Sequence, residues 1–197
     1  LLSVENLSIG FGKSEPVVRD MNFSVAPGET LALVGESGSG KTISCRALLQ
    51  ILPRAAQIRS GRILFNPYEE TVDLATLSAR KMRHIRGNRI AMIFQEPMTA
   101  LNPVFTVGRQ LTEGLRLHKG LDKAAAEARA VELLKEVRIP EAERRMKQYP
   151  HELSGGMRQR VVIAMALALK PQLVIMDEPT TALDVVVQKE ILQRVIR

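Results

Sequence analysis

The chain has few of the residues that cross-link small secreted domains or stack on nucleic-acid bases. It contains no tryptophan, only 4% aromatic residues and a single cysteine, Cys45. One cysteine excludes an internal disulfide and fits a reducing compartment, and the scarcity of aromatic side chains argues against a stacking surface for single strands. The longest apolar stretch, 161–169, is far shorter than the roughly 18 residues of a membrane-spanning helix, and no secretory leader opens the sequence. We therefore expect a cytosolic protein without a nucleic-acid partner.

The remaining composition is that of an ordinary folded domain. Of the 197 residues, 45% are hydrophobic and 25% are charged, which suffices for one well-packed core. The net charge of +7 indicates either attraction to phosphates, anionic lipid or nucleic acid, or a solvated surface with an excess of Arg and Lys. The densest basic segment, 80–89, has no interleaved aromatic residue, which favours a solvated surface; contact with an acidic or membrane-proximal partner stays open. Because the chain starts at Leu1 and stops within a predicted helix, we expect a piece of a longer protein.

The pattern of apolar residues and helix breakers predicts strands that alternate with helices. The expected strands are 2–9, 17–25, 30–34, 62–65, 89–94 and 173–176, and the expected helices include 41–52, 123–137 and 155–169. Asp122 is the predicted N-cap of the second helix, and the segment 107–149 is mostly helical. This alternation predicts an α/β core with a helical subdomain.

A phosphate-binding loop is predicted between the strand 30–34 and the helix that follows it. The segment fits G-x-x-x-x-G-K-[ST] in full, with Gly35, Glu36, Ser37, Gly38, Ser39, Gly40, Lys41 and Thr42. The glycines allow the backbone N–H groups to converge on one anion at the positive end of a helix. Lys41 would reach the β- and γ-phosphates of a nucleotide, and Thr42 would supply a hydroxyl to Mg²⁺. The alternative is a glycine-rich turn that binds nothing.

An acidic pair follows the apolar run 173–176. Asp177 and Glu178 would sit at the carboxyl edge of a parallel sheet, where α/β folds bind their ligands. Asp177 would hold the Mg²⁺ shell, and Glu178 would polarise the attacking water as a general base. A charged junction between strand and loop is the alternative, but the phosphate loop in the same chain favours the functional interpretation.

Residues 153–160, Leu-Ser-Gly-Gly-Met-Arg-Gln-Arg, form a second candidate anion site. Small residues and unpaired N–H groups at a helix start favour bound anions; the alternative is a capped helix with a Gly-Gly turn. The segment resembles the LSGGQ signature of ABC ATPases, with Met157 where the commonest pattern has Gln. In that family two modules pack head to tail, which implies that Ser154, Gly155 and Gly156 contact the γ-phosphate held by the other copy.

The resemblance also implies a fold and further site residues. The expected fold is α/β: a P-loop NTPase core, with a RecA-like parallel sheet and an N-terminal antiparallel β-subdomain, in one ABC ATPase domain over 1–197. A helical subdomain is expected at about 96–170, and the C-terminal part of the core is missing. Gln95 resembles the loop glutamine that ligates Mg²⁺, Asp184 the acid of the loop that links the two sites of the dimer, and Phe11 the aromatic residue that stacks on adenine. Core packing is the alternative for Phe11.

One family element is not found. The resemblance implies a switch histidine after the acidic pair, whereas His84, His118 and His151 all precede that pair. We therefore predict that no histidine of this chain serves as the switch, and that the chain alone turns over ATP poorly.

Within the family, the segments 94–108, 85–87 and 149–160 resemble the peptide-importer branch. That resemblance implies an ATP-hydrolysing subunit of a bacterial importer for dipeptides, oligopeptides, glutathione or nickel, which uses ATP and Mg²⁺. The implied partners are a second ABC module, membrane permease subunits and, indirectly, an extracytoplasmic solute-binding protein, at the cytoplasmic face of the membrane. The alternatives are a non-transport ABC-type ATPase, for phosphonate breakdown, translation or DNA repair, and a nucleotide-binding fragment without activity of its own. No heptad pattern lies between the phosphate loop and the signature, which argues against repair members.

Overall fold

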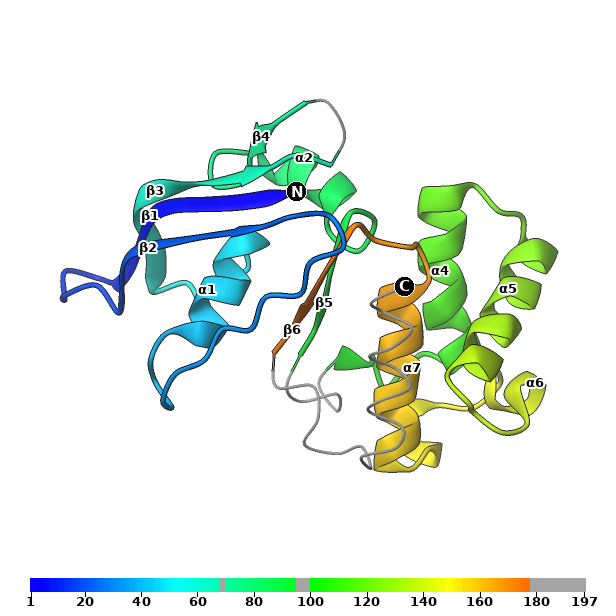
Figure 1. The fold of residues 1–197 in the computed structure, drawn as a ribbon. Coiled ribbons are helices and arrows are strands. Elements are labelled where there is room, and N and C mark those ends of the chain that lie inside the picture. The colour runs from blue at the N-terminus through cyan, green and yellow to red at the C-terminus, as the bar shows by residue number, and fades with distance from the viewer. Residues whose placement is uncertain (68–69, 95–99, 178–197) are drawn as a thin grey trace. The chain divides into compact units, whose positions relative to one another are not determined.

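The computed structural model describes residues 1–67, 70–94 and 100–177. The chain divides into two compact units, one formed by Leu1–Arg86 and a second that begins at Gly87 (Figure 1). Each unit contains its own sheet, and the two sheets differ in the direction of their strands. The expected mixture of an antiparallel N-terminal sheet and a parallel sheet is therefore confirmed.

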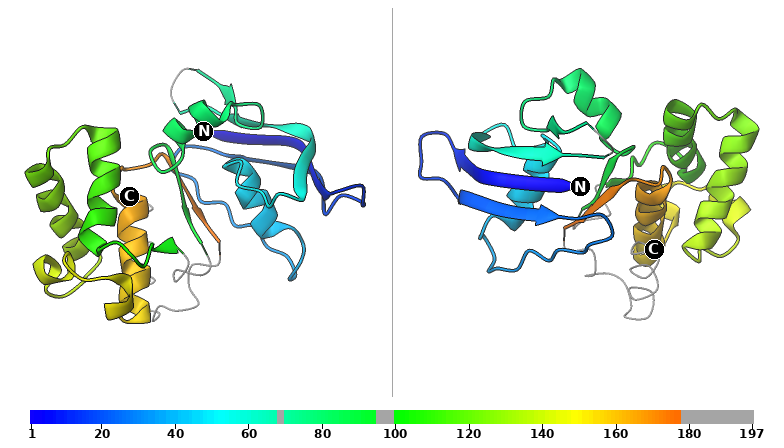
Figure 2. Two further views of the ribbon diagram at one scale, coloured as in Figure 1. Left: turned by 180° about the vertical axis from the view of Figure 1, so that it is seen from behind. Right: turned by 45° about the horizontal axis from the view of Figure 1, so that its top comes forward.

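The first unit is built on an antiparallel sheet with the strand order β2-β1-β3-β4 (Figures 1 and 2). Its strands are β1 (Leu2–Phe11), β2 (Val18–Val25), β3 (Ala56–Phe65) and β4 (Val72–Asp73). Alternate residues of the strands form the apolar core, in which Leu7, Ile9, Ile63 and Phe65 are fully buried. The strands at 2–9 and 17–25 were predicted nearly at these bounds, whereas the strand predicted at 62–65 begins six residues earlier, at Ala56.

Two helices complete the first unit, α1 (Lys41–Leu48) and α2 (Ala79–Ile85). Helix α1 buries Ala47 and Leu48 and lies on one face of the sheet (Figures 1 and 2). The predicted helix 41–52 ends too late, because Gln50 has a left-handed backbone with φ of 51°. A residue in this conformation terminates a helix, so α1 stops before Pro53.

The predicted strand at 30–34 is wrong, because these residues belong to neither sheet. Leu31 is 41% exposed and Val34 is 93% exposed. A strand requires a neighbour that takes up its backbone N–H and C=O groups, and no strand in the described ranges pairs with this segment. The apolar run alone could not reveal whether such a neighbour is present.

The second unit combines a two-stranded parallel sheet with a cluster of helices. Strand β5 (Ile90–Ile93) pairs in register with β6 (Leu173–Met176), so that Ile90 lies opposite Leu173. The helical segments are α4 (Val107–Lys119), α5 (Lys123–Glu136), α6 (Ala142–Arg145), the 3₁₀ turn η1 (Pro150–Glu152) and α7 (Gly155–Leu167). Their apolar faces share one core, which includes the fully buried Leu111, Leu115, Leu134 and Ile163.

The helix starts of the second unit follow the sequence signals for capping. Asp122, the predicted N-cap, accepts a hydrogen bond from the N–H of Ala125 at 2.8 Å. Thr106 and Ser154 cap α4 and α7 in the same way. The helix predicted at 123–137 is confirmed to within one residue, and the helix predicted at 155–169 ends two residues earlier, at Leu167.

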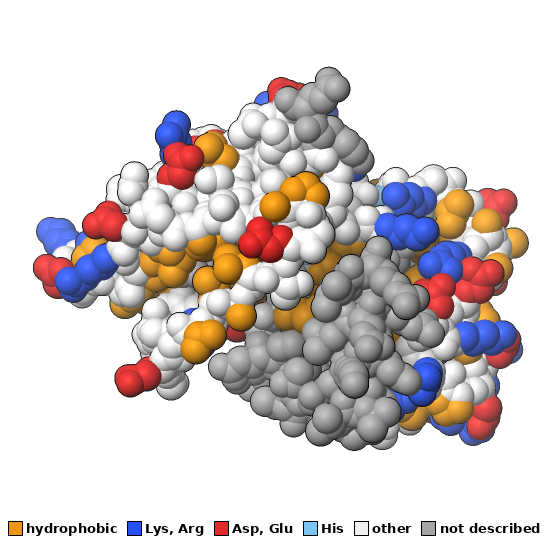
Figure 3. Space-filling view, in the orientation of Figure 1, with side chains coloured by type: hydrophobic (Ala, Val, Ile, Leu, Met, Phe, Trp, Pro, Cys, Tyr) orange, Lys and Arg blue, Asp and Glu red, His pale blue; other side chains and the backbone are white. Residues whose placement is uncertain are grey.

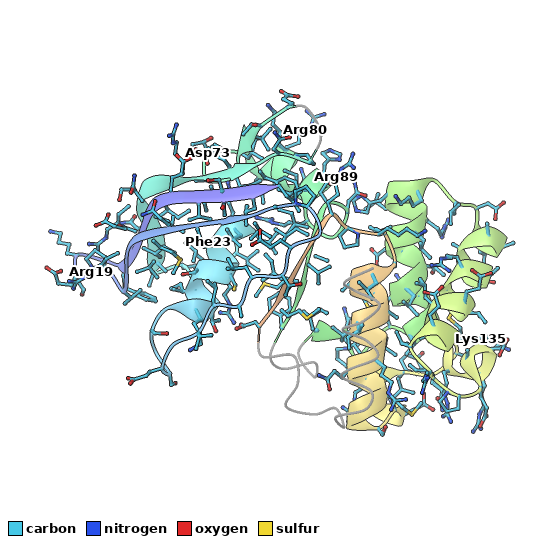
Figure 4. The ribbon with its side chains drawn as sticks, in the orientation of Figure 1. Arg19, Phe23, Asp73, Arg80, Arg89 and Lys135 are labelled. Carbon is cyan, nitrogen blue, oxygen red and sulfur yellow. The ribbon has the colours of Figure 1, made fainter. Side chains whose placement is uncertain are left out.

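Charges of both signs are interspersed on the surface of the helical cluster (Figure 3). Arg129 pairs with Glu132 and Glu136, and Lys135, labelled in Figure 4, pairs with Glu143 at 2.6 Å. The excess of positive charge therefore does not form one continuous field over these helices. Across the described residues, every helix is too short or too polar to span a bilayer.

Candidate functional site

The phosphate loop joins the exposed segment 30–34 to α1. Gly38 and Gly40 have φ values of 83° and 91°, which favour glycine because a side chain at such angles costs energy. The Nζ of Lys41 donates to the carbonyl oxygens of Gly35 at 2.6 Å and Glu36 at 2.8 Å. The loop thus curls around its own lysine. Its carbonyl oxygens hold the ammonium group beside the N-terminal end of α1. Residues 35–39 are exposed, so this cationic turn is open to a ligand.

The first turn of α1 is fixed from inside the unit. The buried Ser44 donates its hydroxyl to the carbonyl oxygen of Gly40 at 2.9 Å. On the other side, a Cβ added to Gly40 would lie 2.7 Å from Cγ2 of Val18, so β2 contacts the end of the phosphate loop directly. Val18 was not among the predicted site residues, because an apolar residue at a strand start carries no functional signal.

Phe11 is the last residue of β1 and is 36% exposed. Two positions earlier on the same face lies Ile9, which pairs with Val18 of β2. Since Val18 contacts Gly40, the strand end that carries Phe11 is connected to the phosphate loop through one pair of neighbouring residues. The exposure of Phe11 argues against the alternative of core packing, and the base-stacking role of Phe11 stays a prediction.

The far end of α1 is held by an arginine. Arg86 donates from Nε to the carbonyl oxygen of Leu49 at 2.8 Å and from Nη2 to that of Gln50 at 3.0 Å. The side chain of Gln50 in turn donates to the carbonyl oxygens of Leu74 and Leu77. The prediction of a solvated basic segment at 80–89 is therefore wrong for Arg86, which is partly buried and caps the phosphate-loop helix.

In the second unit, Asp177 directly follows β6 and is 5% exposed. Its N–H donates to the carbonyl oxygen of Ile93, the last residue of β5, at 3.0 Å, which continues the parallel ladder one residue beyond β6. Asp177 therefore lies at the carboxyl edge of the sheet, as predicted. Gln95, Glu178 and Asp184 lie outside the described residues.

The residues present fit a magnesium ion of the kind that accompanies nucleotides. Such an ion takes one or two protein oxygen ligands and fills its remaining positions with phosphate oxygens and waters. The described ranges contain no group of three or more His, Cys, Asp or Glu side chains that could hold a metal. A single buried carboxylate such as Asp177 is consistent with this sparse coordination.

The signature segment forms the start of α7. Ser154 has an extended backbone, and its Oγ accepts a hydrogen bond from the N–H of Met157 at 3.3 Å. Among the described residues outside its own stretch of helix, no atom lies within 4 Å of a Cβ added to Gly155 or Gly156, so this part of the structure leaves space beside both glycines. The exposed Ser154 and Gly155 therefore present the positive end of a 13-residue helix to the surroundings.

A buried glutamine shapes the loop that leads into α4. Gln110 is 9% exposed, donates to the carbonyl oxygens of Asn102 at 3.0 Å and Phe105 at 2.9 Å, and accepts from the N–H of Asn102 at 2.9 Å. Three backbone groups of one loop are thus satisfied by a single side chain. The sequence indicated an importer-type segment at 94–108 but gave no sign of this contribution from Gln110.

The fold and these two glycine-rich helix starts define an ATP-binding cassette: the chain belongs to the ABC transporter family, whose sequence model matches residues 18–181. It is 52% identical over 197 residues to the oligopeptide transport ATP-binding protein OppD of Bacillus subtilis, covering 98% of this chain and 54% of that protein. It is 50% identical over 198 residues to the glutathione import ATP-binding protein GsiA of Escherichia coli K12, covering 98% of this chain and 32% of that protein. The chain thus spans only about a third to a half of these relatives.

Solved structures of ABC cassettes share the fold. A dimeric ATP-binding cassette in a post-hydrolysis state, bound to ADP and Pi, has a TM-score of 0.83 at 26% identity, over 98% of this chain and 80% of that one. The ATP-binding subunit of an ABC transporter has a TM-score of 0.78 at 32% identity, over 100% of this chain and 73% of that one.

Proposed function

We propose that this chain is the ATP-binding and ATP-hydrolysing module of a bacterial ABC importer for peptides or related small solutes, such as dipeptides, oligopeptides, glutathione or nickel. The main support is the presence of two different glycine-rich helix starts in one chain, the lysine-bearing loop of α1 and the serine-capped glycines of α7. The relatives OppD, an oligopeptide transport ATP-binding protein, and GsiA, a glutathione import ATP-binding protein, support oligopeptides and glutathione within this class. The whole of residues 1–197 would form one ABC domain, with a helical subdomain at about 96–170.

The proposed nucleotide site is shared between two modules packed head to tail. One module holds the triphosphate with the loop Gly35–Thr42 and stacks Phe11 on adenine, while Ser154, Gly155 and Gly156 of the other module contact the γ-phosphate. Only a closed pair supplies both sets of N–H donors, so the binding energy of ATP favours closure. Asp184 would link the two sites across this dimer.

In the proposed reaction, Glu178 accepts a proton from the water that attacks the γ-phosphorus, and the products are ADP and phosphate. Mg²⁺ would be held by Thr42, Gln95 and Asp177 and would neutralise charge on the β- and γ-phosphates. The ammonium of Lys41 stabilises the same charge. Hydrolysis removes the γ-phosphate that joins the two modules and so allows them to separate.

The proposed partners are a second ABC module, permease subunits contacted by the helical subdomain and, indirectly, an extracytoplasmic solute-binding protein. The module would lie at the cytoplasmic face of the membrane as a peripheral subunit. Co-purification of the complete protein with a membrane permease supports this assignment. Co-purification with ribosomes or nucleic acid instead would contradict it.

The decisive experiment compares two variants of the complete protein, Glu178→Gln and Lys41→Ala. Glu178→Gln should bind ATP, elute as a dimer in size-exclusion chromatography and release no phosphate. Lys41→Ala should lose affinity for ATP and remain monomeric under the same conditions. Hydrolysis by Glu178→Gln at the unmodified rate excludes Glu178 as the base, and an unmodified protein without affinity for ATP and Mg²⁺ excludes the function as a whole.

A further inference from the structure

Strand β3 contains a β-bulge opposite the middle of β1. Ser60 pairs with Ser8 and Ile58 pairs with Ile9, so that β3 advances by two residues while β1 advances by one. The extra residue is Arg59. A bulge of this kind turns a side chain out of the regular alternation, and here it directs a long cationic side chain along the surface of the sheet.

The guanidinium of Arg59 lies against the backbone of β1 just before Phe11. A Cβ added to Gly10 would come within 2.6 Å of Cζ and Nε of Arg59. Gly10 is buried although the residues around this strand end are exposed. The absence of a side chain at position 10 is therefore what allows the guanidinium to lie flat on the strand.

The same guanidinium holds the turn that follows Phe11. Nη2 of Arg59 donates to the carbonyl oxygen of Gly12 at 3.0 Å. The N–H of Gly12 donates to the carbonyl oxygen of Ala55 at 3.2 Å, and the N–H of Ser14 donates to that of Phe11 at 3.0 Å. Both polar backbone groups of Gly12 are thus hydrogen-bonded: the carbonyl oxygen to Arg59 of β3, and the N–H to Ala55, which directly precedes β3.

We propose that Arg59 is a positioning residue for the base-stacking ring of the nucleotide site: it fixes the backbone of residues 10–12 and thereby sets the place and angle of Phe11. This inference rests on the proposed function, because it assumes that Phe11 stacks on adenine. Phe11 ends its strand and its ring is partly exposed, so packing alone does not fix it. The orientation of the ring therefore depends on the turn to which Arg59 is bonded.

A ring that is held in place loses little conformational freedom when it stacks on a base, and this preorganisation increases affinity. The effect is confined to the base, because the phosphates are held by a different segment, Gly35–Thr42. Arg59 should therefore influence the affinity for ATP. It should not change the affinity for a ligand that has phosphates but no base. This separation distinguishes positioning of the ring from a general attraction between a cation and an anion.

The experiment measures the binding of ATP and of inorganic tripolyphosphate to the full chain by titration calorimetry. Arg59→Met should weaken ATP binding by roughly fivefold, as expected for partial loss of a base–aromatic contact, and leave tripolyphosphate binding unchanged. Gly10→Ala should produce the same pattern, because the added methyl group displaces the guanidinium. Arg62→Met is the matched control: it removes an equal charge from β3, where Arg62 pairs with Glu5 at 2.7 Å, and should change neither affinity.

A double-mutant cycle tests whether Arg59 acts through Phe11. In a Phe11→Ala background, Arg59→Met should cause no further loss of ATP affinity. An independent loss in that background overturns the proposal, as does unchanged ATP binding by Arg59→Met or an equal weakening of both ligands. If the unmodified chain binds neither ligand, the proposed nucleotide site fails and the role of Arg59 fails with it, whereas the other negative results reject Arg59 alone.

Discussion

Gly40 and Val18 are in direct contact, because a Cβ on Gly40 would lie only 2.7 Å from Cγ2 of Val18. This contact joins Gly40 of the phosphate loop, the N-cap of α1, to the first residue of β2. The geometry of the loop therefore depends on the sheet as well as on its own glycines. It also makes position 40 the most restrictive glycine of the loop, since its φ of 91° is unfavourable for any side chain.

Gly40→Ala is expected to lower both stability and nucleotide affinity. A left-handed backbone costs an alanine roughly 1–2 kcal/mol, and displacement of Val18 adds to this cost. Denaturant unfolding and ATP titration measure the two effects. Gly38→Ala is the control, because Gly38 has a similar φ of 83° but open space around it; equal destabilisation by both variants would show that the contact with Val18 carries no energy.

Ser154 allows the capping of α7 to be separated from phosphate binding. Ser154→Ala should reduce the free energy of unfolding by about 1 kcal/mol, because the N-cap hydrogen bond to Met157 is lost. Ser154→Asp preserves the cap and the stability, but its carboxylate repels the γ-phosphate. Both variants should therefore lose ATPase activity in the complete protein, and normal hydrolysis by Ser154→Asp would refute contact between Ser154 and the nucleotide.

Arg86→Met should loosen the phosphate-loop helix at its C-terminal end. The substitution keeps an apolar stem but removes both hydrogen bonds to Leu49 and Gln50. Since each hydrogen bond from a charged donor contributes about 1.5–3 kcal/mol and the side chain is only partly buried, we expect a loss of about 2 kcal/mol in unfolding free energy. Arg83→Met, three positions earlier on the exposed face of α2, should have almost no effect, and similar losses in both variants would contradict the assigned role of Arg86.

The ion pair of Glu141 and Arg144 predicts that the stability of the fold depends slightly on pH. A hydrogen bond from Nη1 of Arg144, 2.7 Å from Oε2 of Glu141, holds the pKa of that carboxyl below its ordinary value. A lowered pKa in the folded state stabilises the fold above the unfolded pKa, and this contribution is lost as the pH falls through the folded pKa. In Arg144→Met, the pKa of Glu141 measured by NMR titration should rise toward its ordinary value, whereas Arg145→Met, whose guanidinium is 3.8 Å from Glu141, should cause a smaller change.

Local signals in the sequence predicted the elements that depend mainly on local chemistry. The N-cap at Asp122, the glycine conformations of the phosphate loop and the short strand before Asp177 all follow from a few neighbouring residues. The antiparallel N-terminal sheet followed from the family resemblance, whereas the parallel strand 173–176 followed from its apolar run. Site residues at Gln95, Glu178 and Asp184 stay predictions.

Features that depend on distant partners were not predictable. The apolar run at 30–34 has the composition of a strand, but strand formation requires a neighbour that its own residues do not encode. Arg86 is one of several basic residues in its segment, and only the fold brings it to the carbonyl groups of Leu49 and Gln50. In the same way, the bulge at Arg59 arises from the pairing of two strands far apart in sequence.

Helix α7 begins at Gly155, after its N-cap Ser154, and a short connection after its end leads to β6 and Asp177. Its 13 residues form a rod about 20 Å long, whose core is shared with Val174 and Met176 of β6. In the proposed dimer, the Ser154 end of α7 contacts the nucleotide held by the other module. The strand β6, which follows α7, leads to Asp177 at the nucleotide held by the same module. Within each protomer, α7 and β6 would therefore form a stiff connection between the two ATP sites. The presence of ATP at one site would then affect the other site, and the two hydrolysis events would not be independent.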